Sequence, residues 1–441
     1  MPAPPSPASD EPTSSPLKIV SDVACTICGC VCDDLTVRVE NNQIVGLERA
    51  CDLARPWYES LDRSMRPPAS INGSAAEFEA AIEAAAQILN SSRNPLIYGL
   101  SRSSTEGQRA AVQLADRLGA TIDTTASRCH GPSILALQHV GESTCSLGEI
   151  RNRCDLIVFW GSNPQLSHPR HFERYSVEPA GQFVPGGRQD RTVVVVDVEP
   201  TVTSGQADHF LQVEPGRDFE AIWTLRALVQ GIPIDEDRPC GAPLEQLREL
   251  AERMKTCRSG VVFFGLGLTR RENGHASVEA LLRLVTDLNS HTRFYARRMR
   301  VPGDVTGADS VLCWQTGFPF AVNLARGYPR YGPGEYSANE LLERRETDAC
   351  LIVGSESIAR LSPQALANLN ELPTIVLDYP HVESSLRADV SFDTAIYGVH
   401  VPGTAYRMDE TPIPLRSFLE TTLPTDGQVL SRLEAAIFAG D

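Results

Sequence analysis

The sequence predicts an α/β protein in which a small cysteine-rich segment precedes two doubly wound domains with parallel sheets. Three observations support this class. Short runs of consecutive apolar residues recur along the chain, as expected for strands that are buried on both faces. Stretches with apolar residues at helical spacing lie between these runs. Five of the twelve cysteines fall between positions 25 and 51.

The N-terminal residues are rich in proline and serine, so we expect a disordered tail at 1–17, followed by the cysteine segment at 18–66. The tail is neither basic nor apolar, and we therefore expect no secretory signal and a cytoplasmic protein. A formal net charge of -16 argues against a general nucleic-acid binder. No apolar run is long enough for a transmembrane helix, so no membrane partner is expected.

Six apolar runs follow the cysteine segment, and each ends at or beside Gly or Asp, residues that open loops. They lie at 95–99, 155–161, 192–197, 260–265, 350–354 and 374–378. Helical spacing is clear at 75–90 and 277–288. We expect a discontinuous domain at 67–140 with 315–400, a second domain at 141–314 and a C-terminal segment at 401–441. Ligands of such sheets bind beyond the carboxyl ends of the strands.

The clustered cysteines have the spacing of a metal site. The pattern C-x2-C-x3-C-x18-C is formed by Cys25, Cys28, Cys32 and Cys51. In a reducing cytoplasm such thiols are not expected to form disulfides, and four thiolates suit either zinc or an iron–sulfur cluster. Gly29 allows a close approach of the backbone. Cys30 lies between the candidate ligands and is the alternative to Cys32.

A second candidate site begins at Cys129-His130, just before a Gly-Pro turn. A thiolate beside an imidazole can act as a nucleophile or a metal ligand, although on local sequence alone a core cysteine with a hydrogen-bonded histidine is the more ordinary interpretation. After the 155–161 run, backbone N–H groups and side-chain donors for a phosphate are offered by Gly161, Ser162 and Asn163. Asp197 ends its run and can accept from a ribose or a guanine edge.

These motifs, in this order, resemble the molybdopterin oxidoreductase family, the group of the formate dehydrogenases, and within it the B subunits of formylmethanofuran dehydrogenases. The resemblance covers most of the chain after residue 18. It is carried by the stretches 25–34, 125–138 (TASRCHGPSILALQ), 160–171 (WGSNPQLSHPRH), 299–307 (MRVPGDVTG), 329–339 (PRYGPGEYSAN) and 403–408 (GTAYRM).

The resemblance implies that the cysteine segment is an iron–sulfur domain, with a [4Fe-4S] cluster on Cys25, Cys28, Cys32 and Cys51. It further implies that Cys129 binds molybdenum or tungsten carried by two pyranopterin guanine dinucleotides, and that His130 and Arg300 line the reacting centre. An imidazole there can relay a proton, and a guanidinium can hold a carboxylate. The implied cofactor contacts include Gly403 and Thr404, in the C-terminal segment.

The implied reaction is the interconversion of CO2 and formate, or formylmethanofuran, by one subunit of a complex with A-, C- and D-type partners. The chain ends soon after GTAYRM, as expected for a short B subunit whose last pterin-binding domain is a separate subunit. The alternative is a non-redox, structural B subunit of a bacterial formyltransferase/hydrolase complex in methanofuran- and tetrahydromethanopterin-linked one-carbon metabolism. A zinc-stabilised scaffold is a third possibility.

Overall fold

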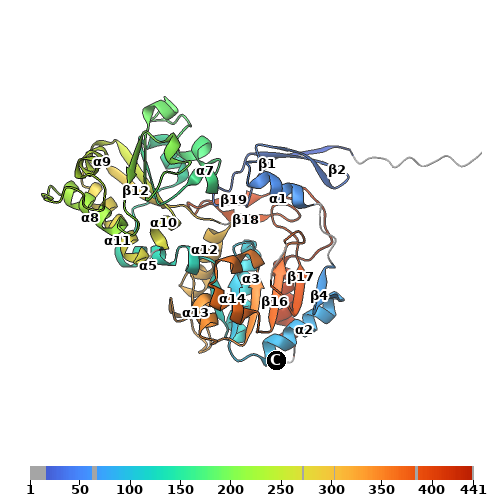
Figure 1. Ribbon diagram of the computed structural model, residues 1–441. Coiled ribbons are helices and arrows are strands. Elements are labelled where there is room, and N and C mark those ends of the chain that lie inside the picture. Colours follow the sequence, from blue (N-terminus) through green and yellow to red (C-terminus); the bar gives the residue numbers. More distant parts are fainter. Residues whose placement is uncertain (1–15, 62–66, 271–272, 302, 383–385, 440–441) are drawn as a thin grey trace, which may run out of the picture.

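Two sheets with parallel strands organise the chain in this computed structural model (Figure 1). The structure describes residues 16–61, 67–270, 273–301, 303–382 and 386–439, so all but the end of the predicted tail at 1–17 lies outside the described residues. The prediction of a mixed α/β protein with parallel sheets is confirmed. Within the described residues, no helix is long and apolar enough to cross a membrane.

The larger sheet has nine strands in the order β14-β13-β7-β6-β15-β16-β17-β4-β5. The central strands β7 to β17 run parallel, whereas the edges are antiparallel. The central strands are β6 (Pro95–Gly99), β7 (Thr121–Thr124), β15 (Ala349–Val353), β16 (Thr374–Asp378) and β17 (Val390–Asp393). The edge strands are β4 (Ala69–Ile71), β5 (Ser74–Ala75), β13 (Val322–Asn323) and β14 (Arg330–Tyr331).

Alternate side chains of these strands enter two separate cores, which explains the unbroken apolar runs. Ile97 and Leu351 belong to one core, whereas Leu96 and Ile352 belong to the other. The first core also takes in the helices α2 (Phe78–Ser91), α3 (Thr105–Leu118), α12 (Val305–Thr316) and α15 (Asp426–Ile437). The second takes in α13 (Ala338–Glu343), η5 (Ser355–Arg360) and α14 (Pro363–Leu369).

The smaller sheet has five parallel strands in the order β10-β9-β8-β11-β12. They are β8 (Leu156–Trp160), β9 (Thr192–Asp197), β10 (His209–Gln212), β11 (Ser259–Phe264) and β12 (Arg293–Arg298). One face packs on α8 (Asp218–Val229), α9 (Leu244–Thr256) and α11 (Gly274–Leu288). The opposite face carries Phe159 and Phe263, whose rings stack. This second face packs on α6 (Leu147–Arg153) and the π-helix η2 (Phe172–Ser176).

The cysteine segment forms the antiparallel sheet of β1 (Lys18–Val23), β2 (Leu35–Glu40) and β3 (Gln43–Glu48), followed by α1 (Ala54–Ser60). It shares one hydrophobic core with the second face of the smaller sheet and with the hairpin of β18 (Gly403–Tyr406) and β19 (Pro412–Leu415). Figure 1 shows this hairpin beside the cysteine segment, at the junction of the two sheet-bearing parts. The short connecting helices are α4 (Ala126–Cys129), α5 (Gly131–Val140), α7 (Pro164–Ser167), η3 (Gly187–Asp190), η4 (Ser204–Gln206) and α10 (Leu266–Thr269).

Candidate functional site

The clustered cysteines line one narrow cavity of about 10 Å³, which the fold builds from the cysteine loop, residues 25–32, and the start of α1. The loop closes on itself through hydrogen bonds from Cys25 N to Cys32 O (2.8 Å) and from Val31 N to Cys28 O (3.1 Å). The backbone carbonyl of Cys51, the fourth predicted ligand, accepts from the N–H groups of Ala54 and Arg55 at the start of α1. All the predicted ligands therefore face one space, and so does Cys30.

The thiols differ in their electrostatic surroundings. A hydrogen bond from the Cys30 thiol and the charge of Arg102 lower the pKa of Cys28 against the effect of burial. Burial raises the pKa of Cys25 and Cys30 well above the ordinary value, and the neighbouring sulfurs add to it. Several anionic sulfurs in one cavity repel each other, so the thiols as arranged need a bound cation to be ionised together.

The cysteines that line this cavity are all free thiols. Within the described ranges, no group of three or more His, Cys, Asp or Glu side chains is gathered tightly enough to hold one metal ion. A four-thiolate zinc site requires all its sulfurs at about 2.3 Å from one centre. The soft sulfur donors match either zinc or an iron–sulfur cluster, the two alternatives that the spacing leaves open.

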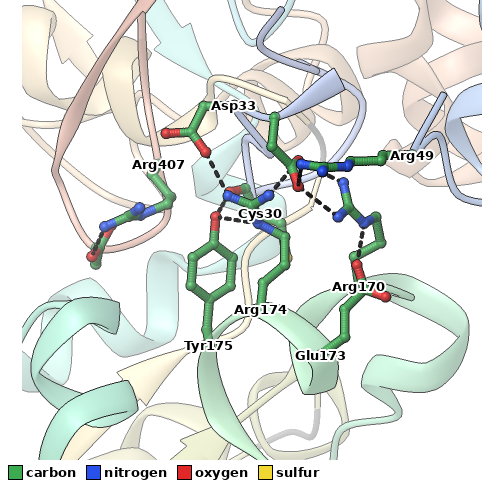
Figure 2. A network of polar contacts seen from close by, with 10 residues as sticks. Cys30, Asp33, Arg49, Arg170, Glu173, Arg174, Tyr175 and Arg407 are labelled. Carbon is green, nitrogen blue, oxygen red and sulfur yellow. Dashed lines mark hydrogen bonds and ion pairs between the residues drawn. The ribbon is translucent and has the colours of Figure 1, made fainter. Parts of the chain in front are cut away.

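A network of ion pairs covers the cysteine segment on the side of the smaller sheet (Figure 2). Arg170 donates to both carboxylate oxygens of Asp34, at 2.7 and 2.8 Å, while its side chain also lines the cysteine cavity. Arg174 pairs with Asp34 and, at 2.5 Å, with Asp33. The hydroxyl of Tyr175 donates to the carbonyl oxygen of Cys30 at 3.2 Å. The loop is thereby fixed to η2 and carries two guanidinium groups beside its sulfurs.

The second candidate site lies where α4 meets α5, beyond the carboxyl end of β7. Cys129 ends α4 and is 1% exposed, and its thiol donates to the carbonyl oxygen of Val301 at 3.5 Å. Burial raises the pKa of Cys129, whereas the positive charges of Arg360 and Arg300 lower it. The structure thus brings the cysteine of the Cys-His turn together with the loop that carries Arg300, as the resemblance implies.

His130 and Arg300 are also buried at this junction. Burial, reinforced by the charges of Arg300 and two further arginines, holds the pKa of His130 well below its ordinary value, so the imidazole is neutral at pH 7. The guanidinium of Arg300 donates to Asp309 and, at 3.1 Å, to the hydroxyl of Thr306. Arg300 therefore has an internal carboxylate partner.

The two candidate sites meet at the backbone of residues 300 and 301. The carbonyl oxygen of Arg300 accepts from His168 Nε2 at 2.9 Å and touches Gly29 in the cysteine loop. The next carbonyl, that of Val301, accepts from Cys129. Burial lowers the pKa of His168 to about 4, so this histidine is a neutral donor to Arg300 at physiological pH.

Several buried polar atoms around the second site have no hydrogen-bond partner among the described residues. Buried polar atoms in folded proteins are nearly always paired, so these atoms are available to water or to a bound polar group. The unpartnered atoms are His130 Nε2, Thr125 Oγ1, Ser162 Oγ, Arg300 Nε and Arg360 Nη1. They offer donors and acceptors to a polar ligand, as a pterin with phosphate groups requires.

The predicted phosphate loop after β8 is tightly packed on the loop after β11. Gly161 has φ +54, and a Cβ there would lie 2.9 Å from the backbone nitrogen of Leu268. Gly267 donates its N–H to the Gly161 carbonyl at 3.0 Å, and a Cβ added at Gly265 or Gly267 would lie 2.7 Å from that carbonyl oxygen, so both glycines serve this backbone contact. The side-chain oxygen of Asn163 accepts from the Thr203 hydroxyl at 2.6 Å. This hydrogen bond connects the loop after β8 to the loop after β9.

The remaining predicted contacts lie on two other elements. Asp197 ends β9, and its carboxylate accepts from Val198 N at 2.8 Å. Because β9 lies beside β8 and runs parallel to it, Asp197 and Gly161 lie at the same carboxyl edge of the smaller sheet. Gly403 and Thr404 belong to β18, where the Thr404 carbonyl accepts from the Thr105 hydroxyl at 3.2 Å. These two residues therefore lie beside the start of α3, a helix that packs on the larger sheet. The Gly161–Asn163 loop follows β8 of the smaller sheet.

Two arginines of the site have no signal in the linear sequence. Arg102 donates to the Thr26 carbonyl of the cysteine loop at 2.8 Å and pairs with Glu356 at 2.7 Å. Arg360 donates to the Val301 carbonyl at 3.1 Å, beside Cys129. Arg102 follows β6 and Arg360 follows β15, two adjacent parallel strands of the larger sheet. Their position beyond the carboxyl ends of parallel strands, where ligands of such sheets bind, is the one signal that could have identified them.

Fold and site together define an α/β protein with parallel sheets in which a thiol-lined cavity is joined by backbone contacts to a buried Cys–His centre. No family model matches the chain. It is 40% identical over 423 residues to the B subunit of the tungsten-containing formylmethanofuran dehydrogenase 2 of Methanocaldococcus jannaschii, covering 94% of this chain and 97% of that one. The protein of the same name from Methanococcus maripaludis is 37% identical over 426 residues, covering 95% and 98%. The chain belongs to the family of formylmethanofuran dehydrogenase B subunits.

Two further similarities concern a bacterial complex of Methylorubrum extorquens. The B subunit of its formyltransferase/hydrolase complex Fhc is 28% identical over 290 residues, covering 65% of this chain and 74% of that one. A chain in the crystal structure of the FhcABCD complex with methylofuran superposes with a TM-score of 0.71 at 24% identity, covering 84% of this chain and 99% of that chain. The structural similarity extends the α/β fold to that complex.

Proposed function

We propose that this chain is the redox subunit of a formylmethanofuran dehydrogenase complex. In this proposal Cys129 binds tungsten or molybdenum carried by two pyranopterin guanine dinucleotides, and Cys25, Cys28, Cys32 and Cys51 hold a [4Fe-4S] cluster. When bound, these groups supply the redox chemistry that interconverts CO2 with formate, and so with formylmethanofuran. The family's name makes the complex an oxidoreductase, and the tungsten in the relatives' names supports a metal–pterin centre.

One observation carries the proposal: residues 300 and 301 contact the cysteine loop on one side and Cys129 on the other. A redox centre and its electron acceptor need such proximity, and a purely structural protein does not. The donor sets suit the groups as well. Soft thiolates suit both a cluster and a metal already held by sulfur, and the unpartnered polar atoms suit a phosphate-bearing pterin.

The chain's own residues then have defined tasks. His130 is neutral at pH 7, and its buried, unpartnered Nε2 can form a hydrogen bond with a group bound at the centre. Arg300 is fixed by Asp309, and its carbonyl is fixed by His168, so the backbone between the two sites is rigid. Burial of Cys129 and His130 excludes water from the reacting centre.

The proposal places the chain in a multisubunit complex. The relatives are named as subunits, and the similar crystal structure is that of the four-part complex FhcABCD. Partners of the A, C and D type would bring the step that joins formate to methanofuran and complete the pterin-binding surface. Small one-carbon compounds are the substrate class in this proposal.

The direct test is Cys129→Ser in the complex purified without air, with Cys313→Ser as the matched control, because Cys313 is an exposed cysteine on α12. Tungsten or molybdenum content and formate-dependent dye reduction should fall at least about tenfold in Cys129→Ser, while iron content is kept. Cys313→Ser should match the wild type in all three. Wild-type activity and metal content in Cys129→Ser would contradict the proposal.

The similarity to the Methylorubrum extorquens complex favours one alternative, a structural B subunit without a redox role. That alternative predicts formyl transfer and hydrolysis by a complex that contains neither tungsten nor molybdenum. It also predicts that Cys129→Ser leaves those activities unchanged. The same purified complex therefore distinguishes the two functions.

A further inference from the structure

Tyr175 of η2 is bound to one peptide group of the cysteine loop (Figure 2). Its hydroxyl donates to the carbonyl oxygen of Cys30 at 3.2 Å. The hydroxyl also accepts from Arg174 Nε at 3.2 Å, and because a guanidinium only donates, this contact directs the hydroxyl proton toward Cys30. The N–H of the same peptide group, on Val31, donates to the Cys28 carbonyl at 3.1 Å. Both polar atoms of the Cys30–Val31 peptide are therefore occupied.

This peptide group leads into a residue with an unfavourable backbone conformation. Val31 has φ +37, in the left-handed region, where a β-branched residue is a steric outlier. Such conformations persist in folded proteins only where the surrounding contacts fix them. The side chain of Val31 is buried in the core that the cysteine segment shares with the smaller sheet. A rotation of the peptide group that relaxed Val31 would break both hydrogen bonds of that group.

The strained residue lies among the candidate metal ligands. The thiols of Cys28, Cys30 and Cys32 all line the cysteine cavity. The carbonyl of Cys32 closes the loop by accepting from Cys25 N at 2.8 Å. The direction in which these thiols point depends on the backbone on either side of Val31, so a rotated peptide would move the sulfurs. Groups that orient metal ligands from outside the coordination shell contribute strongly to metal affinity.

We propose that Tyr175 is a positioning residue of the thiol site, whose hydroxyl holds the Cys30–Val31 peptide in its strained orientation and thereby places the sulfur of Cys32 for metal binding. This inference rests on the proposed function, because it concerns the metal that the thiols bind. The cysteine spacing does not contain it, since Tyr175 is 145 residues from Cys30. The tyrosine ring is itself held by cations, because the guanidinium carbons of Arg174 and Arg407 lie 5.2 Å from its centroid.

The experiment introduces Tyr175→Phe, which removes only the hydroxyl, into three backgrounds of the complex purified without air: wild type, Val31→Ala and Val31→Gly. Alanine and glycine both remove the valine methyl groups, but only alanine keeps the Cβ that disfavours a positive φ. Val31→Asn, which also tolerates this region, replaces Val31→Gly if that variant does not fold. Tyr328→Phe, at an exposed tyrosine, is the control. Iron and zinc contents, visible absorption and the rate of metal release to a chelator are measured.

In the wild-type and Val31→Ala backgrounds, we expect Tyr175→Phe to speed metal release by about tenfold to hundredfold, the range by which such outer groups change metal affinity. In the Val31→Gly background the effect should shrink to less than about threefold, because glycine needs no hydroxyl to keep this conformation. An equal effect in all three backgrounds would overturn the inference, and so would unchanged metal release in Tyr175→Phe alone. A wild-type complex without metal on these thiols would instead overturn the proposed function itself.

Discussion

A Cβ atom added to Gly29 would lie 2.3 Å from the carbonyl oxygen of Arg300. The cysteine loop thus meets the backbone of the second site with no room for a side chain. A hydrogen bond from Met408 N to the Gly29 carbonyl at 2.9 Å brings the C-terminal hairpin to the same point. Three segments far apart in the sequence meet at one glycine, which couples the geometry of the two sites.

Gly29→Ala should therefore disturb both sites. The clash is with backbone, which moves less easily than a flexible side chain, so we expect stability to fall by about 2 kcal/mol and iron content to fall with it. Gly205→Ala is the control, because nothing lies within 4 Å of the Cβ that it would add. Thermal unfolding and iron analysis of the two variants provide the measurement. Equal behaviour of both variants would show that the close contact is not needed.

The four predicted cluster ligands should respond differently from Cys30. Cys28→Ser is expected to abolish the visible absorption of the cluster and destabilise the cysteine segment, because metal binding is coupled to folding. Cys30→Ser should keep the absorption, although Cys30 lines the same cavity. Cys32→Ser decides between the two ligand sets. If Cys32→Ser keeps the cluster and Cys30→Ser loses it, Cys30 and not Cys32 is the third ligand.

Arg170 should not be replaceable by lysine. Its guanidinium donates two parallel hydrogen bonds to Asp34 and lines the cysteine cavity, whereas an ammonium donates from a single point. We expect Arg170→Lys to lower stability by about 1–2 kcal/mol and to reduce cluster content. Arg188→Lys, in the solvent-exposed pair with Asp208, should cost less than about 0.5 kcal/mol. Thermal melting of both variants tests the difference.

The buried pair of Arg407 and Asp409 predicts a pH dependence. Burial opposes ionisation of Asp409, but the hydrogen bonds from Arg407 and Leu147 outweigh it and lower the pKa of Asp409. The folded-state pKa of Asp409 therefore lies below its pKa in the unfolded chain, which is about 3.9. The ion pair stabilises the fold fully at pH values above about 3.9, and this contribution is lost as the pH falls through the folded-state pKa.

Asp409→Asn is therefore expected to cost about 3 kcal/mol at pH 7, because it leaves Arg407 without its carboxylate. The difference from the wild type should shrink as the pH falls below about 4. Unfolding curves at several pH values measure it. A difference that stays constant down to low pH would mean that the ion pair has no such role.

The sequence was informative where a feature is local. The apolar runs at 95–99 and 374–378 match β6 and β16, because a strand buried on both faces reads as continuous apolar sequence. The Cys-His turn and the cysteine spacing are local too. Their assignment as metal ligands, and the domain boundaries, stay predictions.

Features that depend on residues far apart in the sequence have no recognisable local pattern. The strand β12 has the sequence RFYARR, and Arg297 is buried only because Met408, Thr144 and Glu410 accept its hydrogen bonds. The strand β7, TIDT, is buried through Asp123, which accepts from the backbone of Ala321 and Ala338. Arg360 likewise reaches Cys129 only through the fold.

The most direct test of the central claim is metal and iron analysis, with an ultraviolet–visible spectrum, of the complex purified without air from its native host. We predict about four irons per chain together with tungsten or molybdenum and extractable pterin. An active complex that contains no metal would contradict this prediction and establish a structural role for the chain. Zinc alone would show that the cluster assignment is wrong.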